Sequence, residues 1–119
     1  KVPLFDLRRY HLLLAGASWM AEYGDPDDPD EWAFMRGYSP YHLLRRGVSY
    51  PALLVTTSTR DDRVHPAHAR KFVARMEEYG CTPLYYENIE GGHAGAADNA
   101  QAAYMDALGY AFFWVTVGR

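Results

Sequence analysis

The chain has 119 residues, 49% of them apolar, and its 12 Lys and Arg against 15 Asp and Glu give a formal charge of −3. This balance is typical of one globular domain or part of one, and it leaves no basic surface to neutralise the phosphates of a nucleic acid. No uncharged stretch approaches the ~20 residues of a membrane span, and the lone Cys81 excludes an internal disulfide or a cysteine-based zinc site.

Turn-forming and capping residues divide the first half of the chain. Five leucines surround an Arg8–Arg9 pair over residues 4–14, a pattern typical of a short helical or irregular segment. Asp28 followed by Pro29 predicts the N-cap and first turn of a helix that runs to about Met35. Ser39 and Pro40 repeat this device and predict a second short helix over 40–45.

The second half predicts a parallel strand–helix–strand unit. Residues 52–57 form a continuous apolar and β-branched run, as expected of a strand buried on both faces. Pro66 then predicts the start of a helix that ends at Gly80, and residues 83–88 predict a second strand. Such a crossover is almost always right-handed, with parallel strands and helices on the faces of the sheet.

The last predicted helix, from residue 98 to about 116, is apolar on every side after Asp106. A helix of this kind needs cover all round, which two strands cannot supply. The aromatic content of 15% also exceeds what a small domain easily buries, and the first residue is Lys1 rather than Met. We therefore expect the chain to be a fragment whose missing neighbours lie in a larger protein or a partner chain.

Two loops that follow the predicted strands carry candidate catalytic groups. Ligands of open α/β sheets bind beyond the carboxyl ends of the strands. Asp61 and Asp62 lie in the first loop, and His93 lies in the second loop beside Gly91, Gly92 and Gly95. An Asp and a Gly-flanked His in this order fit the acid and base of a Ser, Asp, His triad.

The sequence resembles the prolyl oligopeptidase family of serine peptidases, in the last part of its α/β-hydrolase domain. The resemblance runs along nearly the whole chain, in the family's order. Its landmarks are Leu4-Phe5-Asp6, Gly16-Ala17-Ser18-Trp19, Tyr23-Gly24, Tyr38-Ser39-Pro40, Tyr50-Pro51, Asp61-Asp62-Arg63-Val64 and Gly92-His93. It implies a parent enzyme in which a β-propeller restricts access to the catalytic domain and which cleaves short peptides after proline. Residues 1–119 then form part of the peptidase domain, with no propeller and no cofactor or metal.

The resemblance also implies roles for individual residues. By the family pattern, Asp61 rather than Asp62 is similar to the triad carboxylate and His93 to the triad base, while Asp62 is similar to a structural or secondary acid. The substrate-binding residues would be Trp19 and Tyr23 in a pocket for the proline ring, Val64 as a further wall, and Arg63 as donor to a peptide carbonyl. An indole face suits a proline ring because both are flat, apolar and rigid.

Each role has a structural alternative. Asp61 could instead cap the helix after Pro66 or pair with a neighbouring arginine, and His93 could occupy an ordinary surface turn. Trp19 and Tyr23 could be core residues, and Arg63 could form a solvated ion pair. His65 and His68 are three residues apart, but no third ligand is nearby in the sequence, so we reject a metal site.

The nucleophile is the main departure from the family pattern. The family's serine lies in a Gly-x-Ser-x-Gly-Gly turn, which is absent from this chain. Ser18 precedes Asp61 and His93 in the correct order, but Met20 stands where the turn requires glycine. We therefore expect the serine and the oxyanion donors to lie in another segment.

Alternatives to a prolyl peptidase are an esterase or acyl hydrolase of the same fold, or a non-catalytic piece used for association. The compartment stays open between cytoplasm and periplasm.

Overall fold

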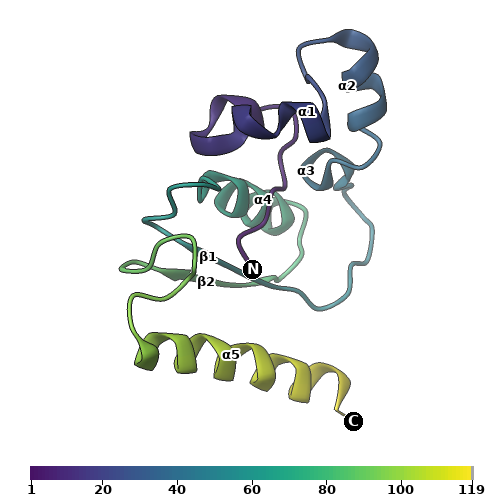
Figure 1. Ribbon diagram of the computed structural model, residues 1–119. Coiled ribbons are helices and arrows are strands. Elements are labelled where there is room, and N and C mark those ends of the chain that lie inside the picture. The colour runs from purple at the N-terminus through teal and green to yellow at the C-terminus, as the bar shows by residue number, and fades with distance from the viewer. Residues whose placement is uncertain (119) are drawn as a thin grey trace.

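The computed structural model describes residues 1–118, whose helices and strands are shown in Figure 1. The helical elements are the 3₁₀ helices η1 (Tyr10–Leu12) and η2 (Leu14–Trp19) and the α-helices α1 (Met20–Tyr23), α2 (Pro29–Met35), α3 (Pro40–Leu43), α4 (Ala67–Glu78) and α5 (Asn99–Val117). The strands are β1 (Leu54–Ser58) and β2 (Leu84–Asn88).

The two strands form a parallel sheet joined through α4, as the sequence predicts. The register pairs Leu54 with Leu84 at one end and Ser58 with Asn88 at the other, so both strands finish at the same edge. The last four residues of β1 are all buried, in keeping with their apolar and β-branched sequence. In Figure 1, α4 lies on one side of the sheet and α5 on the other.

The inner face of α4 supplies most of the core beside the sheet. Phe72, Val73 and Met76, the residues whose spacing predicts an amphipathic helix, are all buried. Val73 packs against Val55 of β1. Burial of a side chain such as Phe72 contributes about 1.5–3 kcal/mol. The chain then reverses at Gly80, whose φ of +84° is strained for any residue with a side chain.

The N-terminal half confirms one predicted cap and corrects the other. The carboxylate of Asp28 accepts hydrogen bonds from the N–H groups of Asp30 (2.9 Å) and Glu31 (3.0 Å), so it caps α2 as expected. Ser39 does not cap α3, which ends at Leu43 rather than residue 45. Its hydroxyl instead accepts the N–H of Leu7 at 3.1 Å. This long-range bond ties α3 to the N-terminal segment.

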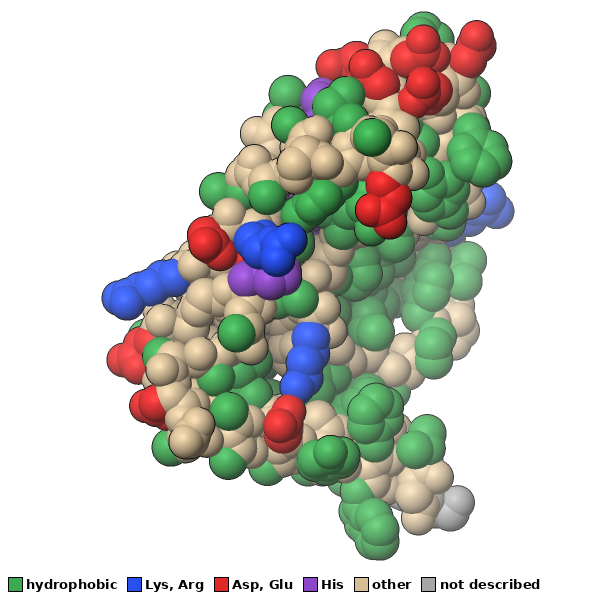
Figure 2. Space-filling view, in the orientation of Figure 1, with side chains coloured by type: hydrophobic (Ala, Val, Ile, Leu, Met, Phe, Trp, Pro, Cys, Tyr) green, Lys and Arg blue, Asp and Glu red, His purple; other side chains and the backbone are tan. Residues whose placement is uncertain are grey.

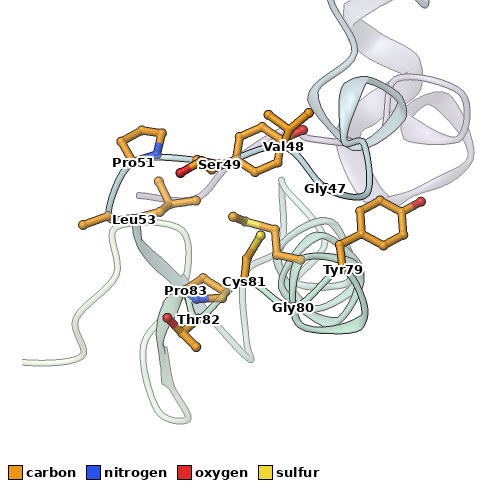
Figure 3. A pocket seen from close by; sticks show the side chains of 13 residues that line it. Gly47, Val48, Ser49, Pro51, Leu53, Tyr79, Gly80, Cys81, Thr82 and Pro83 are labelled. Carbon is orange, nitrogen blue, oxygen red and sulfur yellow. The ribbon is translucent and has the colours of Figure 1, made fainter.

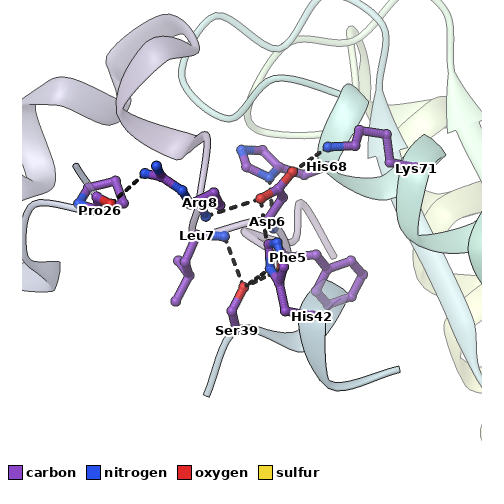
Figure 4. A network of polar contacts seen from close by, with 9 residues as sticks. All are labelled: Phe5, Asp6, Leu7, Arg8, Pro26, Ser39, His42, His68 and Lys71. Atoms are coloured by element: carbon purple, nitrogen blue, oxygen red, sulfur yellow. Dashed lines mark hydrogen bonds and ion pairs between the residues drawn. The ribbon is translucent and has the colours of Figure 1, made fainter. Parts of the chain in front are cut away.

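A buried polar network centred on Asp6 attaches the N-terminal segment to α3 and α4 (Figure 4). The Asp6 carboxylate pairs with Lys71 of α4, and its backbone N–H donates to Nδ1 of His68 at 3.1 Å. Burial acts to raise the pKa of Asp6, but the hydrogen bond and charge of Lys71 outweigh it, so that the pKa is lowered. Burial lowers the pKa of His68 to about 4, which keeps this imidazole neutral.

The last helix, α5, leaves most of its apolar surface open. Asp98 caps it by accepting the N–H of Gln101 at 2.8 Å, and Met105 is its buried residue. Tyr110 and Trp114 are 75% and 77% exposed. Figure 2 shows apolar side chains over the lower end of the molecule, where α5 lies.

The radius of gyration is 15.4 Å, against about 13.5 Å for a compact domain of this length. Across residues 1–118, none of the helices combines the length and apolar character required to cross a membrane.

Candidate active site

Asp61 is fixed by the turn that follows β1. One carboxylate oxygen, Oδ1, accepts the N–H groups of Arg63 and Val64, each at 2.9 Å. The side chain of Asp61 is fully buried. Because two backbone N–H groups donate to one oxygen, the carboxylate keeps a fixed direction.

His93 lies in a tight glycine-rich loop that follows β2. The N–H of Gly95 donates to the carbonyl of Gly92 at 2.9 Å, which closes a turn around His93. A Cβ on Gly91 would lie 2.4 Å from the carbonyl oxygen of Gly95, and Gly95 itself has a φ of +91°. Glycine is therefore required at both positions for the loop to fold back on itself.

The two loops bring Asp61 and His93 into direct contact. His93 Nδ1 lies 3.0 Å from each carboxylate oxygen of Asp61, in the range that the triad interpretation requires. An ionised carboxylate only accepts hydrogen bonds, so Nδ1 is assigned as the donor and Nε2 as the free base. The imidazole is 34% exposed while the carboxylate is buried. Such a pair can take a proton at Nε2 and stabilise the imidazolium that forms.

Neither structural alternative for Asp61 is found in the described part of the fold, whereas His93 does lie in a partly exposed turn. The helix after Pro66 has no side-chain cap, so Asp61 does not serve it. Within residues 1–118, the ion pair found for Asp61 is the one with His93. Asp62, its neighbour, is exposed. The structure thus separates the two adjacent aspartates by their surroundings, and Asp61 is the one directed at the imidazole.

The base of the Asp61 loop is tied to β2 and α4 by a second acidic residue. Glu87 accepts Nε of Arg70 at 3.0 Å and the hydroxyl of Thr59 at 2.5 Å. The hydrogen bond from Arg70 is the main cause that lowers the pKa of Glu87 to about 2. Since Thr59 lies two residues before Asp61, this cluster fixes where the loop leaves the sheet.

The predicted substrate-binding residues lie in two groups. Trp19 packs beside a buried cluster that includes Tyr10, and Tyr23 lies edge-on to the same Tyr10 ring at 5.9 Å. Val64 is buried, whereas Arg63 is exposed and has no ion pair in the part of the chain that the structure describes. The groups are joined where the N–H of Ala15 in η2 donates to the carbonyl of Arg63 at 3.2 Å.

Two cavities of the fold lie at opposite ends of the strands. A hollow of about 220 Å³ beside His93 is lined by Thr56, Thr57 and Met105 among others, and by none of the four predicted substrate-binding side chains. A larger cavity of about 530 Å³ lies at the opposite ends of the strands, around Leu53 and Cys81 (Figure 3). It contains no histidine or carboxylate to act as acid or base. The hollow at His93 is the candidate site because it borders the imidazole that contacts Asp61.

His65, His68 and Ser18 each form a hydrogen bond with the backbone. His65 Nδ1 accepts the N–H of Ala67, and His68 Nδ1 accepts that of Asp6. Residues 1–118 contain no cluster of three metal-ligating side chains. The hydroxyl of Ser18 is exposed and donates to the carbonyl of Ala15 at 2.6 Å.

Asn88 is the site residue that sequence reasoning did not identify. It is the last residue of β2, it is buried, and its side chain contacts the loop that carries His93. An asparagine at a strand end, two and three residues before the N–H groups that it binds, is an Asx-turn signal that could have revealed this contact.

The chain is similar in sequence to known proteins along nearly its whole length. A family model described as "Prolyl oligopeptidase family" matches residues 1–119. An uncharacterised peptidase, y4nA, of Sinorhizobium fredii is 53% identical over 114 residues, which cover 96% of this chain and 16% of that protein. A prolyl endopeptidase of Elizabethkingia miricola is 36% identical over 119 residues, covering 94% of this chain and 17% of that protein.

The solved structures agree with the family match. A post-proline cleaving enzyme from Rickettsia typhi superposes with a TM-score of 0.94 at 33% identity, over 98% of this chain and 17% of that one. The fold is thus the α/β type of these catalytic domains. The chain spans about one sixth of the length of the curated relatives that it matches.

Proposed function

The chain belongs to the prolyl oligopeptidase family, and on that basis we propose that it supplies the Asp and His of the triad in a serine peptidase that cleaves short peptides after proline. The observation that carries this proposal is the 3.0 Å contact between His93 Nδ1 and the buried carboxylate of Asp61. The serine and the oxyanion donors come from the remainder of the catalytic domain, and a β-propeller domain restricts access to peptides of limited length.

In this mechanism His93 Nε2 takes the proton of the serine hydroxyl as that oxygen attacks the peptide carbonyl. The Asp61 carboxylate holds Nδ1–H and stabilises the imidazolium. His93 then returns the proton to the leaving amine, and water hydrolyses the acyl-enzyme by the same route. The N–H groups of Arg63 and Val64 hold the carboxylate in this orientation throughout.

Specificity for proline is proposed, on the resemblance to the family, to come from Trp19, Tyr23, Val64 and Arg63. Trp19 and Tyr23 offer aromatic faces to the pyrrolidine ring, and Val64 adds an apolar wall. The exposed Arg63 guanidinium donates to a substrate carbonyl, a planar geometry that suits arginine better than lysine. The link between Ala15 and the Arg63 carbonyl fixes the segment bearing Trp19 against this loop.

The decisive experiment compares two adjacent aspartates in the full-length protein. We expect Asp61→Asn to lower kcat on a chromogenic peptide ending in proline by about 10⁴-fold, because the amide favours the wrong tautomer of His93. Asp62→Asn is the matched control, since its carboxylate is exposed, and it should retain near-wild-type activity.

Three outcomes would contradict the proposal. Equal effects of the two substitutions would remove the special role of Asp61. Hydrolysis of p-nitrophenyl esters without any peptide cleavage would instead identify an esterase of the same fold. A full-length protein inactive on both substrates would favour a role in association.

A further inference from the structure

We propose that Asn88 is a positioning residue for His93: its side-chain amide joins the two ends of the loop 89–95 and so holds the imidazole where Nδ1 meets Asp61. This inference rests on the proposed function, because it assigns a task within the same acid–base pair. Within residues 1–118, the hydrogen bonds of the Asn88 side chain go to neither His93 nor Asp61, so it acts through the loop backbone.

The carbonyl oxygen of the Asn88 side chain holds the beginning of the loop. Oδ1 accepts the N–H of Glu90 at 2.9 Å and the N–H of Gly91 at 3.1 Å. These two bonds turn the chain sharply as it leaves β2. Asn88 is 4% exposed, so water does not compete for them effectively.

The amide nitrogen of the same side chain holds the end of the loop. Nδ2 donates to the carbonyl of Gly95, two residues after His93, at 2.7 Å. It also donates to Oε1 of Gln101 in α5 at 2.9 Å, and Ser58 of β1 adds a longer bond of 3.4 Å to the Gly95 carbonyl. One planar amide therefore bridges both ends of the loop that carries His93 at its tip.

His93 depends on this bridge because its ring has little other support. Within residues 1–118, the hydrogen bonds recorded for the His93 ring are those to Asp61. The backbone carbonyl of Asn88 also accepts the N–H of Thr59 at 2.8 Å, at the start of the loop that carries Asp61. Asn88 is thus hydrogen-bonded to both the loop that carries His93 and the start of the loop that carries Asp61. A displacement of about 1 Å between two catalytic side chains can cost 10²-fold in rate.

The test uses three variants of the full-length protein. Asn88→Leu keeps the approximate size of the side chain but has neither donor nor acceptor, and Asn88→Asp keeps an acceptor oxygen for Glu90 and Gly91. Ser39→Ala is the matched control, because Ser39 is equally buried and hydrogen-bonded but lies far from the loop in the network around Asp6.

We expect Asn88→Leu to lower kcat on a proline peptide by about 100-fold with KM nearly unchanged, and Asn88→Asp to fall between this variant and wild type. Hydrogen exchange followed by mass spectrometry should show at least about 10-fold faster exchange over residues 89–97 in Asn88→Leu. Ser39→Ala should match wild type in kcat and in exchange of this segment.

Two results would overturn the inference. One is a kcat of Asn88→Leu within about twofold of wild type, and the other is a lower kcat with unchanged exchange over 89–97. If the wild-type protein cleaves no peptide, the proposed function fails, and a crystal structure of Asn88→Leu decides the inference separately. His93 Nδ1 displaced beyond ~3.5 Å from Asp61 would support the positioning role, and an unchanged contact would refute it.

Discussion

Protonation of His68 should weaken the attachment of α4 as the pH falls from 7 to 5. The imidazole is 2% exposed, and its Nδ1 accepts the N–H of Asp6. A second proton would remove this acceptor and place a buried charge near Lys71. Burial is the main cause that lowers the pKa of His68 from 6.5 to about 4, with the charge of Asp6 opposing it.

The sign and size of the effect follow from proton linkage. The folded pKa is depressed, so the stability that neutral His68 allows is complete above the unfolded value of 6.5 and is lost as the pH falls toward 4. The whole loss is about 3 kcal/mol, and the part between pH 7 and pH 5 is about 2 kcal/mol. His42, whose pKa burial also lowers, adds a smaller contribution of the same sign.

Native-state hydrogen exchange of α4 in the full-length protein measures this loss directly. We expect the free energy of opening to fall by about 2 kcal/mol more in wild type than in His68→Asn, whose amide oxygen can still accept the N–H of Asp6. His65→Asn, on the same helix, should keep the wild-type dependence on pH. A His68→Asn protein that loses as much as wild type between pH 7 and 5 would refute the reasoning.

Three further predictions concern the site. Trp19→Ala should lower kcat/KM for proline substrates by a factor that corresponds to about 3–5 kcal/mol, and more than for alanine substrates. Arg63→Ala should lower kcat/KM for both kinds of substrate by a factor that corresponds to about 1.5–3 kcal/mol, and an unchanged ratio of the two kcat/KM values in folded Trp19→Ala would make Trp19 a core residue only. Gly91→Ala should lower kcat at least about 10-fold, because its Cβ would lie 2.4 Å from the Gly95 carbonyl oxygen. Gly109→Ala, in open space on α5, should stabilise the helix by about 0.5–1 kcal/mol, and kinetics and calorimetry on both variants check these effects. The isolated 119-residue chain should not cleave a chromogenic proline peptide, and turnover that Ser18→Ala abolishes would contradict the assignment of the serine to another segment.

The sheet and its connecting helix could be predicted from sequence because local signals agree there. A β-branched run gave β1, and Pro66 and Gly80 bracket α4. The meeting of the two loops followed from the rule that parallel strands present their carboxyl ends at the same edge, and the family resemblance selected Asp61 over Asp62. Their proposed catalytic roles stay predictions until the variants are measured.

The remaining features depend on partners distant in the sequence. Ser39 precedes Pro40 as an N-cap residue would, but its hydroxyl accepts the N–H of Leu7, 32 residues away. No local sequence pattern predicts this long-range hydrogen bond. The bridge formed by Asn88 was equally hidden, because its amide meets Gly95 only after the loop has closed. Leu14, with a φ of +50°, shows why the leucine-rich opening forms short 3₁₀ turns rather than one regular helix.

The acid–base pair and most of the contacts that align it come from one continuous stretch, residues 54–95, with Gln101 and Ala15 as the outside partners. Both strands, the helix between them, both loops and the Asn88 bridge lie inside this segment, while the serine is proposed to come from elsewhere. The segment can therefore be exchanged between relatives as a single cassette without separating Asp61 from His93. In protein engineering, it offers a natural pair of cut points for chimeric peptidases, one before β1 and one after the His93 loop.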